Sequence, residues 1–227
     1  MTYVKRIVCL ANSYKNHGSC IAGKEVRQDG YGPWIRPIST RPTAEVSHAE
    51  CRYQNNTAPK VLDIIDVSLE HAAPQHHQTE NHVIDTSIMW VKRGDLPWDE
   101  VGELCDDPAS LWVNSQHTSA GVYDCISQEE AATLDNSLVL IRPESFVVRV
   151  GTSYWTGKPS YRGAFDYHGT HYNMSVTDPV IRAAFAGRAQ GDYPVDDVYL
   201  CVSFTEPYEH DDRCHKLVAA VISNTAF

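Results

Sequence analysis

The feature that most constrains the fold is the order of elements expected over residues 142–222: three strands, a helix, then two further strands. The helix is indicated by Asp178 before Pro179, because a capping residue commonly precedes a proline in the first helical turn. The apolar runs 197–204 and 215–222 have the length of barrel strands. This order is that of a five-stranded OB barrel, a scaffold that mostly holds oligonucleotides or oligosaccharides. The sequence therefore predicts an OB-like barrel at this end of the chain.

One hairpin in this region, residues 161–177, predicts an outward polar face. Gly169 followed by Thr170 fits a type II′ turn, which takes glycine at its first central position. That turn gives the pairs His168–His171, Tyr167–Tyr172, Asp166–Asn173, Phe165–Met174 and Arg162–Thr177. Since side chains alternate along a strand, Phe165, Tyr167, Tyr172, Met174 and Val176 share one face, and Arg162, Asp166, His168, His171, Asn173 and Ser175 share the other. We expect the first face to line a barrel interior and the second to face outwards.

The rest of the chain is long enough for a second small barrel. A length of 227 residues is long for one such domain and comfortable for two. Strands are expected over 4–11, 20–26, 34–39 and 61–69, helical turns from Pro108 and Ser127, and a strand over 137–141. Pro37 cannot donate to a ladder, so the strand around it is expected at an edge or a bulge. The fold class predicted is all-β with small helical insertions: two OB-like barrels, 1–141 and 142–227, with an acidic insertion in the first.

Charge is segregated along the chain. The net charge is −10, yet residues 1–60 carry nine Lys/Arg against four Asp/Glu. Residues 61–141 carry two against fifteen, and residues 142–227 carry eight against ten. Proteins that bind long duplexes neutralise many phosphates with basic side chains. This balance disfavours tight, sequence-blind binding to long duplex DNA, and the acidic middle is either a solvated surface or a surface that faces a basic partner.

Seven segments, in consistent order over about residues 3–222, resemble the dual OB-containing domain family of bacteria. They are Ile7-Val-Cys-Leu-Ala-Asn-Ser13, Trp34-Ile-Arg-Pro-Ile-Ser39, Leu62-Asp-Ile-Ile-Asp-Val67, Gln78-Thr-Glu-Asn81, Val176-Thr-Asp-Pro179, Cys201-Val-Ser-Phe-Thr-Glu-Pro207 and Lys216-Leu-Val-Ala-Ala-Val-Ile222. The resemblance implies two OB-like barrels and a cytoplasmic protein associated with prokaryotic conflict or defence. It also implies binding of nucleic acid or of a nucleotide-derived ligand.

Aromatic and basic side chains near the expected loops form the candidate ligand surface. Single-stranded nucleic acids are held by aromatic platforms for the bases and by cations for the backbone. The candidates are Trp34, Arg36 and Arg41 in the first barrel and Tyr154, Trp155, Lys158, Tyr161 and Arg162 in the second. Trp155 stands in a loop between two strands, where OB folds take ligands, or plugs a barrel end. Trp34 is expected in the core, and Arg36 could instead hold the acidic middle segment. The loop 206–213 contains four acids and one arginine, so the ligand is expected to be short.

Metal binding and catalysis have little support. His71, His76, His77 and His82 crowd one loop, but their spacing lies at or beyond the range of tight zinc-ligand pairs, so no metal and no cofactor are expected. The nucleotide-binding, metalloprotease, hydrolase and deaminase motifs are missing. The tripeptides at His77 and His168 match only the minimum of a two-histidine phosphoesterase. An acid–base cluster of His168, His171 and Asp166 stays an alternative to a simple cross-strand polar pair.

These observations favour a binding module that recognises single-stranded nucleic acid or a nucleotide-like ligand. Two alternatives stay open: a nucleotide-processing enzyme of phosphodiesterase type, centred on His168, His171 and Asp166, and an adaptor that docks a basic protein on the acidic segment. Seven cysteines without a C-x-x-C pair, and no secretory or membrane-spanning run, predict reduced thiols in the cytoplasm and no membrane partner.

Overall fold

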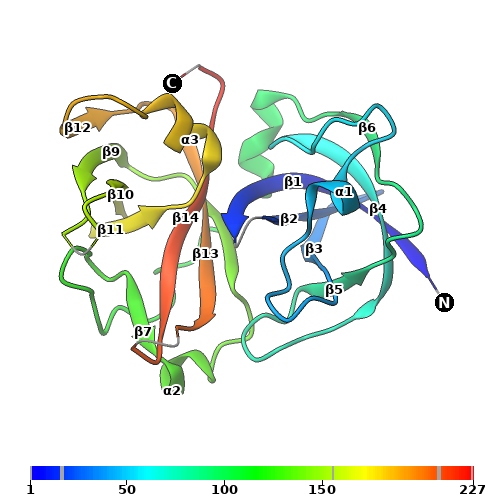
Figure 1. The fold of residues 1–227 in the computed structure, drawn as a ribbon, viewed down its shortest axis with the longest axis horizontal. Helices are drawn as coiled ribbons and strands as arrows, with labels where there is room; N and C mark the ends of the chain where they lie inside the picture. Colours follow the sequence, from blue (N-terminus) through cyan, green and yellow to red (C-terminus); the bar gives the residue numbers. More distant parts are fainter. Residues whose placement is uncertain (1, 16–17, 155, 209–210, 226) are drawn as a thin grey trace. The chain divides into compact units, whose positions relative to one another are not determined.

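The computed structural model describes residues 2–15, 18–154, 156–208, 211–225 and 227 (Figure 1). The chain is mostly β, with short helices, as the sequence predicted. It divides into two compact units, Met1–Leu104 and Cys105–Phe227, each with its own sheet. None of the helices in the described ranges is both long and apolar enough to cross a bilayer.

The sheet of the first unit has the strand order of an OB barrel. Its elements are β1 (Tyr3–Lys15), β2 (Gly18–Arg27), β3 (Gly30–Ile38), α1 (His48–Cys51), β4 (Asp63–Ala72), β5 (Asn81–Ile84), β6 (Val91–Asp95) and the 3-10 helix η1 (Trp98–Leu104). The strands lie in the order β1-β2-β3-β5-β4-β6, with β3 and β5 parallel. β1 also pairs with β4, which closes the first five strands into a barrel.

Closure of this barrel depends on how β1 bends. Its first half pairs with β4 from Tyr3 to Val8, and its second half pairs with β2, with a register shift between Cys9 and Ala11. A bulge of this kind increases the local twist, so one strand can serve two neighbours. The interior is filled by a cluster that includes Ile7, Ile35, Ile65 and Trp90.

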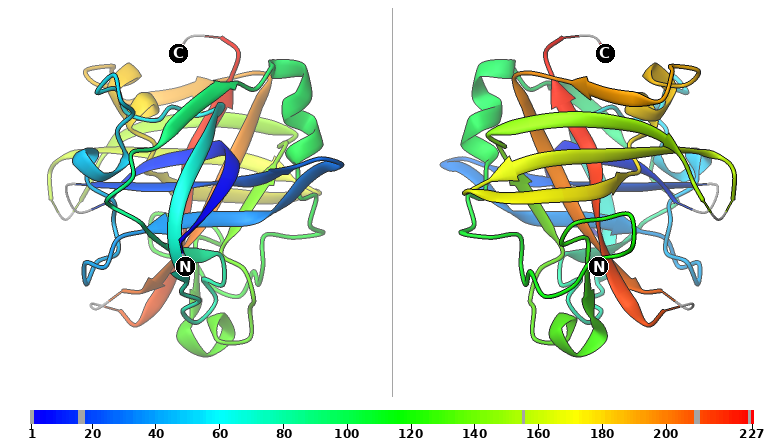
Figure 2. Two further views of the ribbon diagram at one scale, coloured as in Figure 1. Left: turned by 90° about the vertical axis from the view of Figure 1, so that its right-hand side faces the viewer. Right: turned by 90° about the vertical axis from the view of Figure 1, so that its left-hand side faces the viewer.

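The second unit repeats the order with more peripheral elements. These are β7 (Cys125–Ser127), α2 (Gln128–Ala131), β8 (Leu138–Ile141), β9 (Ser145–Thr152), β10 (Pro159–Tyr167), β11 (Thr170–Val176), α3 (Pro179–Ala184), β12 (Gly191–Pro194), β13 (Val198–Pro207) and β14 (Arg213–Ser223). The main path is β12-β9-β10-β11-β14-β13-β8, and β11 and β14 are parallel. In the right panel of Figure 2, β10 and β11 run across β13 and β14, as the strands of a small barrel do.

The first barrel strand of this unit is made of two pieces. β8 pairs with β13, and β9 pairs with β10, with only residues 142–144 between them. One bent segment therefore supplies both β9, beside β10, and β8, beside β13, and so serves as the first strand of the barrel. The sequence placed the domain boundary at 141/142, whereas the structure divides the chain after Leu104. The difference arises because β7 and β8 hydrogen-bond to β14 and β13 of the second unit.

The hairpin of β10 and β11 has the predicted faces but a different register. The pairs are Asp166–His171, Phe165–Tyr172 and Arg162–Ser175. The central turn residues are His168 and Gly169, both with positive φ (47° and 69°), as a type I′ turn requires. The predicted type II′ turn is therefore wrong: the turn lies one residue earlier, and the pairing of the strands is shifted by two residues. Because the shift is even, Phe165, Tyr167, Tyr172, Met174 and Val176 still point into the core, where all are buried.

The outer face of this hairpin is partly covered by the chain itself. Residues 118–124, which we name the strap, lie against β11. The backbone of Val122 exchanges two hydrogen bonds of 3.1 Å with that of Asn173, and the Asn173 amide donates to the Ala120 carbonyl at 3.0 Å. The face that was expected to be open is therefore occupied at its centre, and Asn173 is buried.

Some of the helices predicted from local sequence signals are present, and one is not. Ser127 caps α2 with the predicted capping box, and Asp178 caps α3 ahead of Pro179. No helix forms at residues 108–113. β3 lies between β2 and β5, but at Pro37 only β5 is paired, so this residue lies at a local edge, as predicted. It is tolerated because the pairing of β3 with β2 ends at Ile35, so no donor is needed on that side.

A lysine is fully buried in the second unit. The ammonium of Lys216 donates to the Val113 carbonyl at 2.7 Å and to the Asn114 amide oxygen at 3.0 Å, and lies 6.0 Å from the centre of the Tyr172 ring. Burial lowers its pKa to about 8, although Cys125, Asp124 and Glu130 favour the charged form. The folded protein thus holds this proton less tightly than the unfolded chain does.

The free energy of unfolding is expected to depend on the protonation of Lys216 at alkaline pH. Between pH 8 and the unfolded value of 10.5 the unfolded chain binds more protons at Lys216, so this residue makes stability rise with pH. The gain amounts to at most about 3 kcal/mol. Burial raises the pKa of Cys214 to about 11, which acts in the opposite direction. Urea unfolding of the wild type and of Lys216→Met across this range isolates the lysine, and a pH-independent difference between them would contradict the expectation.

Candidate ligand-binding surfaces

In OB barrels, ligands lie on the outer face of the second and third strands and on the loops after the first and fourth strands. In the first unit these are β2 and β3 with the loops around residues 16–17 and 73–80. In the second unit they are β10 and β11 with the loops 153–158 and 208–212. Residues 16–17, 155 and 209–210 lie outside the described residues.

Trp34 lies on the outer face of the first barrel. It pairs with Lys24 across β2 and β3, and the Lys24 ammonium is 5.7 Å from the centre of the indole ring. Its neighbour Ile35 belongs to the core, so alternation directs Trp34 to the opposite side. The expectation that Trp34 is a core residue is therefore wrong. The pair puts an aromatic surface beside a cation on the wall where OB barrels hold ligands.

The two arginines predicted to bind ligand in the first unit already hold carboxylates. Arg36 is buried and forms an ion pair with Glu80 at 3.1 Å, in which both side chains are almost fully covered. Arg41 contacts Glu50 at 2.5 Å and also donates to the Ser39 hydroxyl and the Glu45 carbonyl. Arg36 thus does pair with an acid from the middle of the sequence, as its alternative role predicted. Both guanidinium groups are therefore engaged within the chain.

The loop between β9 and β10 displays an aromatic residue. Tyr154 is 91% exposed, and Lys158 in the same loop is exposed as well. The loop is held by its own hydrogen bonds, from the Ser153 amide to the Lys158 carbonyl and from the Gly157 amide to the Ser153 carbonyl, both 2.9 Å. Trp155 lies outside the described residues. Tyr154 is therefore presented on a short closed loop at a ligand edge of the barrel.

The other two candidates of the second unit contact neighbouring side chains. Tyr161 is half-buried, and the Arg182 guanidinium lies 5.7 Å from its ring centre. Arg162 donates to Asn173, to the Ser175 hydroxyl and, at 2.7 Å, to the carboxylate of Asp124 in the strap. The guanidinium that was expected to bind phosphate is therefore engaged with an acid of the same chain.

The three catalytic candidates do not form a single acid–base cluster. His171 contacts Asp166 at 2.8 Å, and the second oxygen of Asp166 accepts from the Ser145 hydroxyl at 2.8 Å. His168 contacts a different acid, Asp107, at 3.1 Å. The hydrogen bonds from Ser145 and His171 outweigh burial and lower the pKa of Asp166. Each histidine is thus attached to its own carboxylate on an exposed surface, and the pairing of His168 with His171 does not occur.

The four histidines between residues 71 and 82, all of them among the described residues, do not gather as metal ligands. His82 lies on β5 and contacts the Tyr3 hydroxyl at 2.6 Å, and burial lowers the pKa of His82. His77 is buried, whereas His71 and His76 are exposed. Within the part of the chain that the structure describes, no three His, Cys, Asp or Glu side chains gather as a metal site would require.

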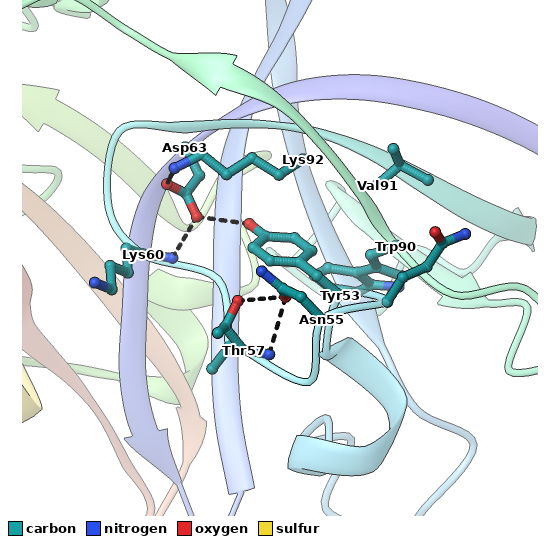
Figure 3. A pocket seen from close by; sticks show the side chains of 10 residues that line it. Tyr53, Asn55, Thr57, Lys60, Asp63, Trp90, Val91 and Lys92 are labelled. Carbon is teal, nitrogen blue, oxygen red and sulfur yellow. Dashed lines mark hydrogen bonds and ion pairs between the residues drawn. The ribbon is translucent and has the colours of Figure 1, made fainter.

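The sequence did not predict one cluster of buried side chains in the first unit. Tyr53, Asp63 and Trp90 surround a cavity there (Figure 3). The sequence does place Asp63 at the start of an apolar strand, where it is buried, and a carboxylate in that position needs partners. Its partner Tyr53 and the cavity wall Trp90 are distant along the chain, so the pattern alone could not join them.

The family comparison agrees with this architecture. The model of the dual OB-containing domain family matches residues 5–221. No match was found among curated proteins or among solved structures. The match covers both barrels, and a dual OB architecture is that of a binding module. The chain belongs to the dual OB-containing domain family.

Proposed function

We propose that this protein binds short single-stranded nucleic acid, or a nucleotide-like ligand, mainly by stacking bases on exposed aromatic side chains. The observation that carries the proposal is Tyr154, which is 91% exposed on a loop closed by its own hydrogen bonds. This loop follows the first barrel strand, one of the two loops by which OB folds hold oligonucleotides. The bacterial defence setting and cytoplasmic location implied by the family resemblance belong to the same proposal.

The first unit offers a second aromatic side chain, Trp34, which is partly buried and lies beside the buried Lys24. Trp34 and Lys24 lie opposite each other on β2 and β3, the strands that carry ligands in OB folds. Stacking on an aromatic ring tolerates any base, since every base has a π face, and contributes ~1–3 kcal/mol per base. Tyr154 and Trp34 are each expected to stack one base.

The charge balance of the two units indicates that contacts to phosphate groups contribute little to the binding affinity. The second unit carries eight Lys/Arg against sixteen Asp/Glu, and the first carries eleven against thirteen. In the second unit Arg142, Arg149, Arg162 and Arg213 all face aspartates. Few cations are therefore left to release counterions from a strand, and the affinity is expected to depend only weakly on salt. This favours short ligands over long ones.

The experiment is fluorescence anisotropy with labelled single-stranded DNA and RNA oligonucleotides. Tyr154→Ala is expected to weaken binding about tenfold, the equivalent of one lost stacking contact, whereas Tyr154→Phe keeps the ring and should bind as the wild type does. Because Tyr154 is exposed, neither substitution should change the melting temperature. The proposal fails if the wild type binds no oligonucleotide at low salt, or if Tyr154→Ala binds as tightly as Tyr154→Phe.

A further inference from the structure

We propose that Lys216 and Asn114 become joined by an isopeptide bond inside the second unit, from the lysine ε-nitrogen to the carbonyl carbon of the asparagine side chain. The Nζ atom of Lys216 lies 3.0 Å from Oδ1 of Asn114, and this oxygen is bonded directly to the carbon that would be attacked. The two residues are 102 positions apart in the sequence, so only the fold brings them together. The bond would change the covalent structure of the chain and is independent of the function proposed above.

Lys216 has the environment of a reactive amine. It is fully buried on β14, where its Nζ also donates to the Val113 carbonyl at 2.7 Å. Burial lowers its pKa to about 8, although Cys125, Asp124 and Glu130 favour the charged form. At pH 7 about one molecule in ten therefore carries the neutral amine at this position. A desolvated lysine of lowered pKa is a nucleophile, because its nitrogen then has a free electron pair.

The fixed geometry of the two side chains compensates for the low reactivity of an amide. A nucleophile held against its target gains an effective concentration on the order of 10⁵–10⁸ M. Lys216 is held by its two acceptors, and Asn114 is held by a bond of 2.8 Å from its Nδ2 to the Tyr172 hydroxyl. Lys216 and Tyr172 are both fully buried, which limits the access of water to the reacting atoms.

The Tyr172 hydroxyl lies beside the leaving group, since Nδ2 of Asn114 is the nitrogen that must depart. Once the lysine nitrogen has added to the carbonyl carbon, Nδ2 is an amine and can accept the proton of this hydroxyl. The bond between this carbon and Nδ2 then breaks, the carbonyl double bond forms again, and ammonia leaves. The lysine nitrogen returns one proton to the tyrosine oxygen. The products are one secondary amide and one ammonia, with no oxidation or reduction.

Formation of the bond would remove the titrating amine at position 216. The alkaline dependence of unfolding described above therefore belongs to the chain that has not reacted. A cross-link between Asn114 and Lys216 also restricts the unfolded chain over 102 positions. The reacted wild type should accordingly melt at a higher temperature than Asn114→Ala.

Mass spectrometry of the denatured full chain, after incubation at mildly alkaline pH, tests the bond. The wild type should weigh less than its sequence mass by about 17 Da, the mass of one ammonia. A protease digest should contain two peptides linked through Asn114 and Lys216. Asn114→Ala and Lys216→Met should each keep the full sequence mass, and Tyr172→Phe should slow the mass loss by about a hundredfold.

Asn136→Ala is the matched control for the asparagine. Asn136 accepts a hydrogen bond of 2.9 Å from the Trp112 indole in the same unit, so its loss also removes a side-chain contact. This variant should lose ammonia as the wild type does. Oligonucleotide binding at the Tyr154 loop should be the same in the wild type and in Asn114→Ala, so that either proposal can fail without the other.

The inference is overturned if the wild type keeps its full mass after prolonged incubation, a measurement that needs no substitution. It is also overturned if the mass loss persists in Lys216→Met. That result would indicate a cyclic imide formed by Asn114 with its own backbone, which releases ammonia without a cross-link. Linked peptides that join Asn114 to Lys216 distinguish the isopeptide bond from the imide.

Discussion

Replacing Asp124 by alanine is expected to lower the free energy of unfolding by about 3–5 kcal/mol, since the change leaves the largely buried Arg162 without its counter-ion. The carboxylate accepts from the Thr118 amide and hydroxyl, both at 2.7 Å, and from Arg162 at 2.7 Å, and only 5% of its side chain is exposed. Burial alone would raise the pKa of Asp124, but the bonds from Thr118 and Arg162 outweigh it and lower the pKa. Asp124 thus links Thr118, at the start of the strap, to Arg162 of the barrel, beside the backbone bonds between Val122 and Asn173.

Urea unfolding at neutral pH measures this effect. Asp192→Ala is the matched control, because that carboxylate is mostly exposed and faces Arg149 at 3.4 Å, and it should cost less than about 1 kcal/mol. The lowered pKa means that the contribution of Asp124 is present above the unfolded value of 3.8 and is lost as the pH falls below it. The difference between wild type and Asp124→Ala should therefore shrink in acid. Equal losses for the two variants would show that the strap is not held in this way.

Gly23→Ala is expected to destabilise the first unit by about 3 kcal/mol or more. A Cβ atom at this position would lie 2.0 Å from the carbonyl oxygen of Val8. The clash involves backbone, which cannot rotate away as a side chain can, so the strand itself would have to move. Gly23 pairs with Cys9 where β1 bends from β4 towards β2, and a shift there would open the barrel.

Gly94→Ala provides the control for this substitution. An added Cβ at Gly94, on β6 of the same unit, meets no atom within 4 Å. Thermal or urea unfolding should show a small change for Gly94→Ala and a loss of cooperativity or a much lower midpoint for Gly23→Ala. If both variants unfold like the wild type, the structure can accommodate a methyl group at position 23, and the expectation is contradicted.

Strand order and strand faces were accessible from the sequence where alternation was clear. The apolar set of β10 and β11 was identified correctly, because any even register keeps the same side chains inside. The register itself was not, since His168-Gly169 and Gly169-Thr170 are both acceptable two-residue turns. His168 adopts a positive φ of 47° and contacts Asp107, a residue far away in the sequence. Only that environment distinguishes the two turns.

The candidate ligand residues divide in the same way. Tyr154 and Lys158 were selected for their loop composition, and both are exposed at a ligand edge of the barrel. Arg36 and Arg162 were selected for their charge, and each pairs with an acid, Glu80 or Asp124, that no local pattern connects to it. A charged residue can be recognised in a sequence, but whether its charge is already neutralised depends on partners brought by the fold.

By itself, the sequence determined the element order of the second barrel, the caps at Ser127 and Asp178 and the inward face of the hairpin. These features depend on residues within a few positions of one another. The tertiary structure alone decided the closure of each barrel, the place of the strap over Asn173 and the assembly of Tyr53, Asp63 and Trp90 around one cavity. Each of these unites segments far apart in the chain, and their pairing follows from burial and hydrogen-bond satisfaction over the whole fold.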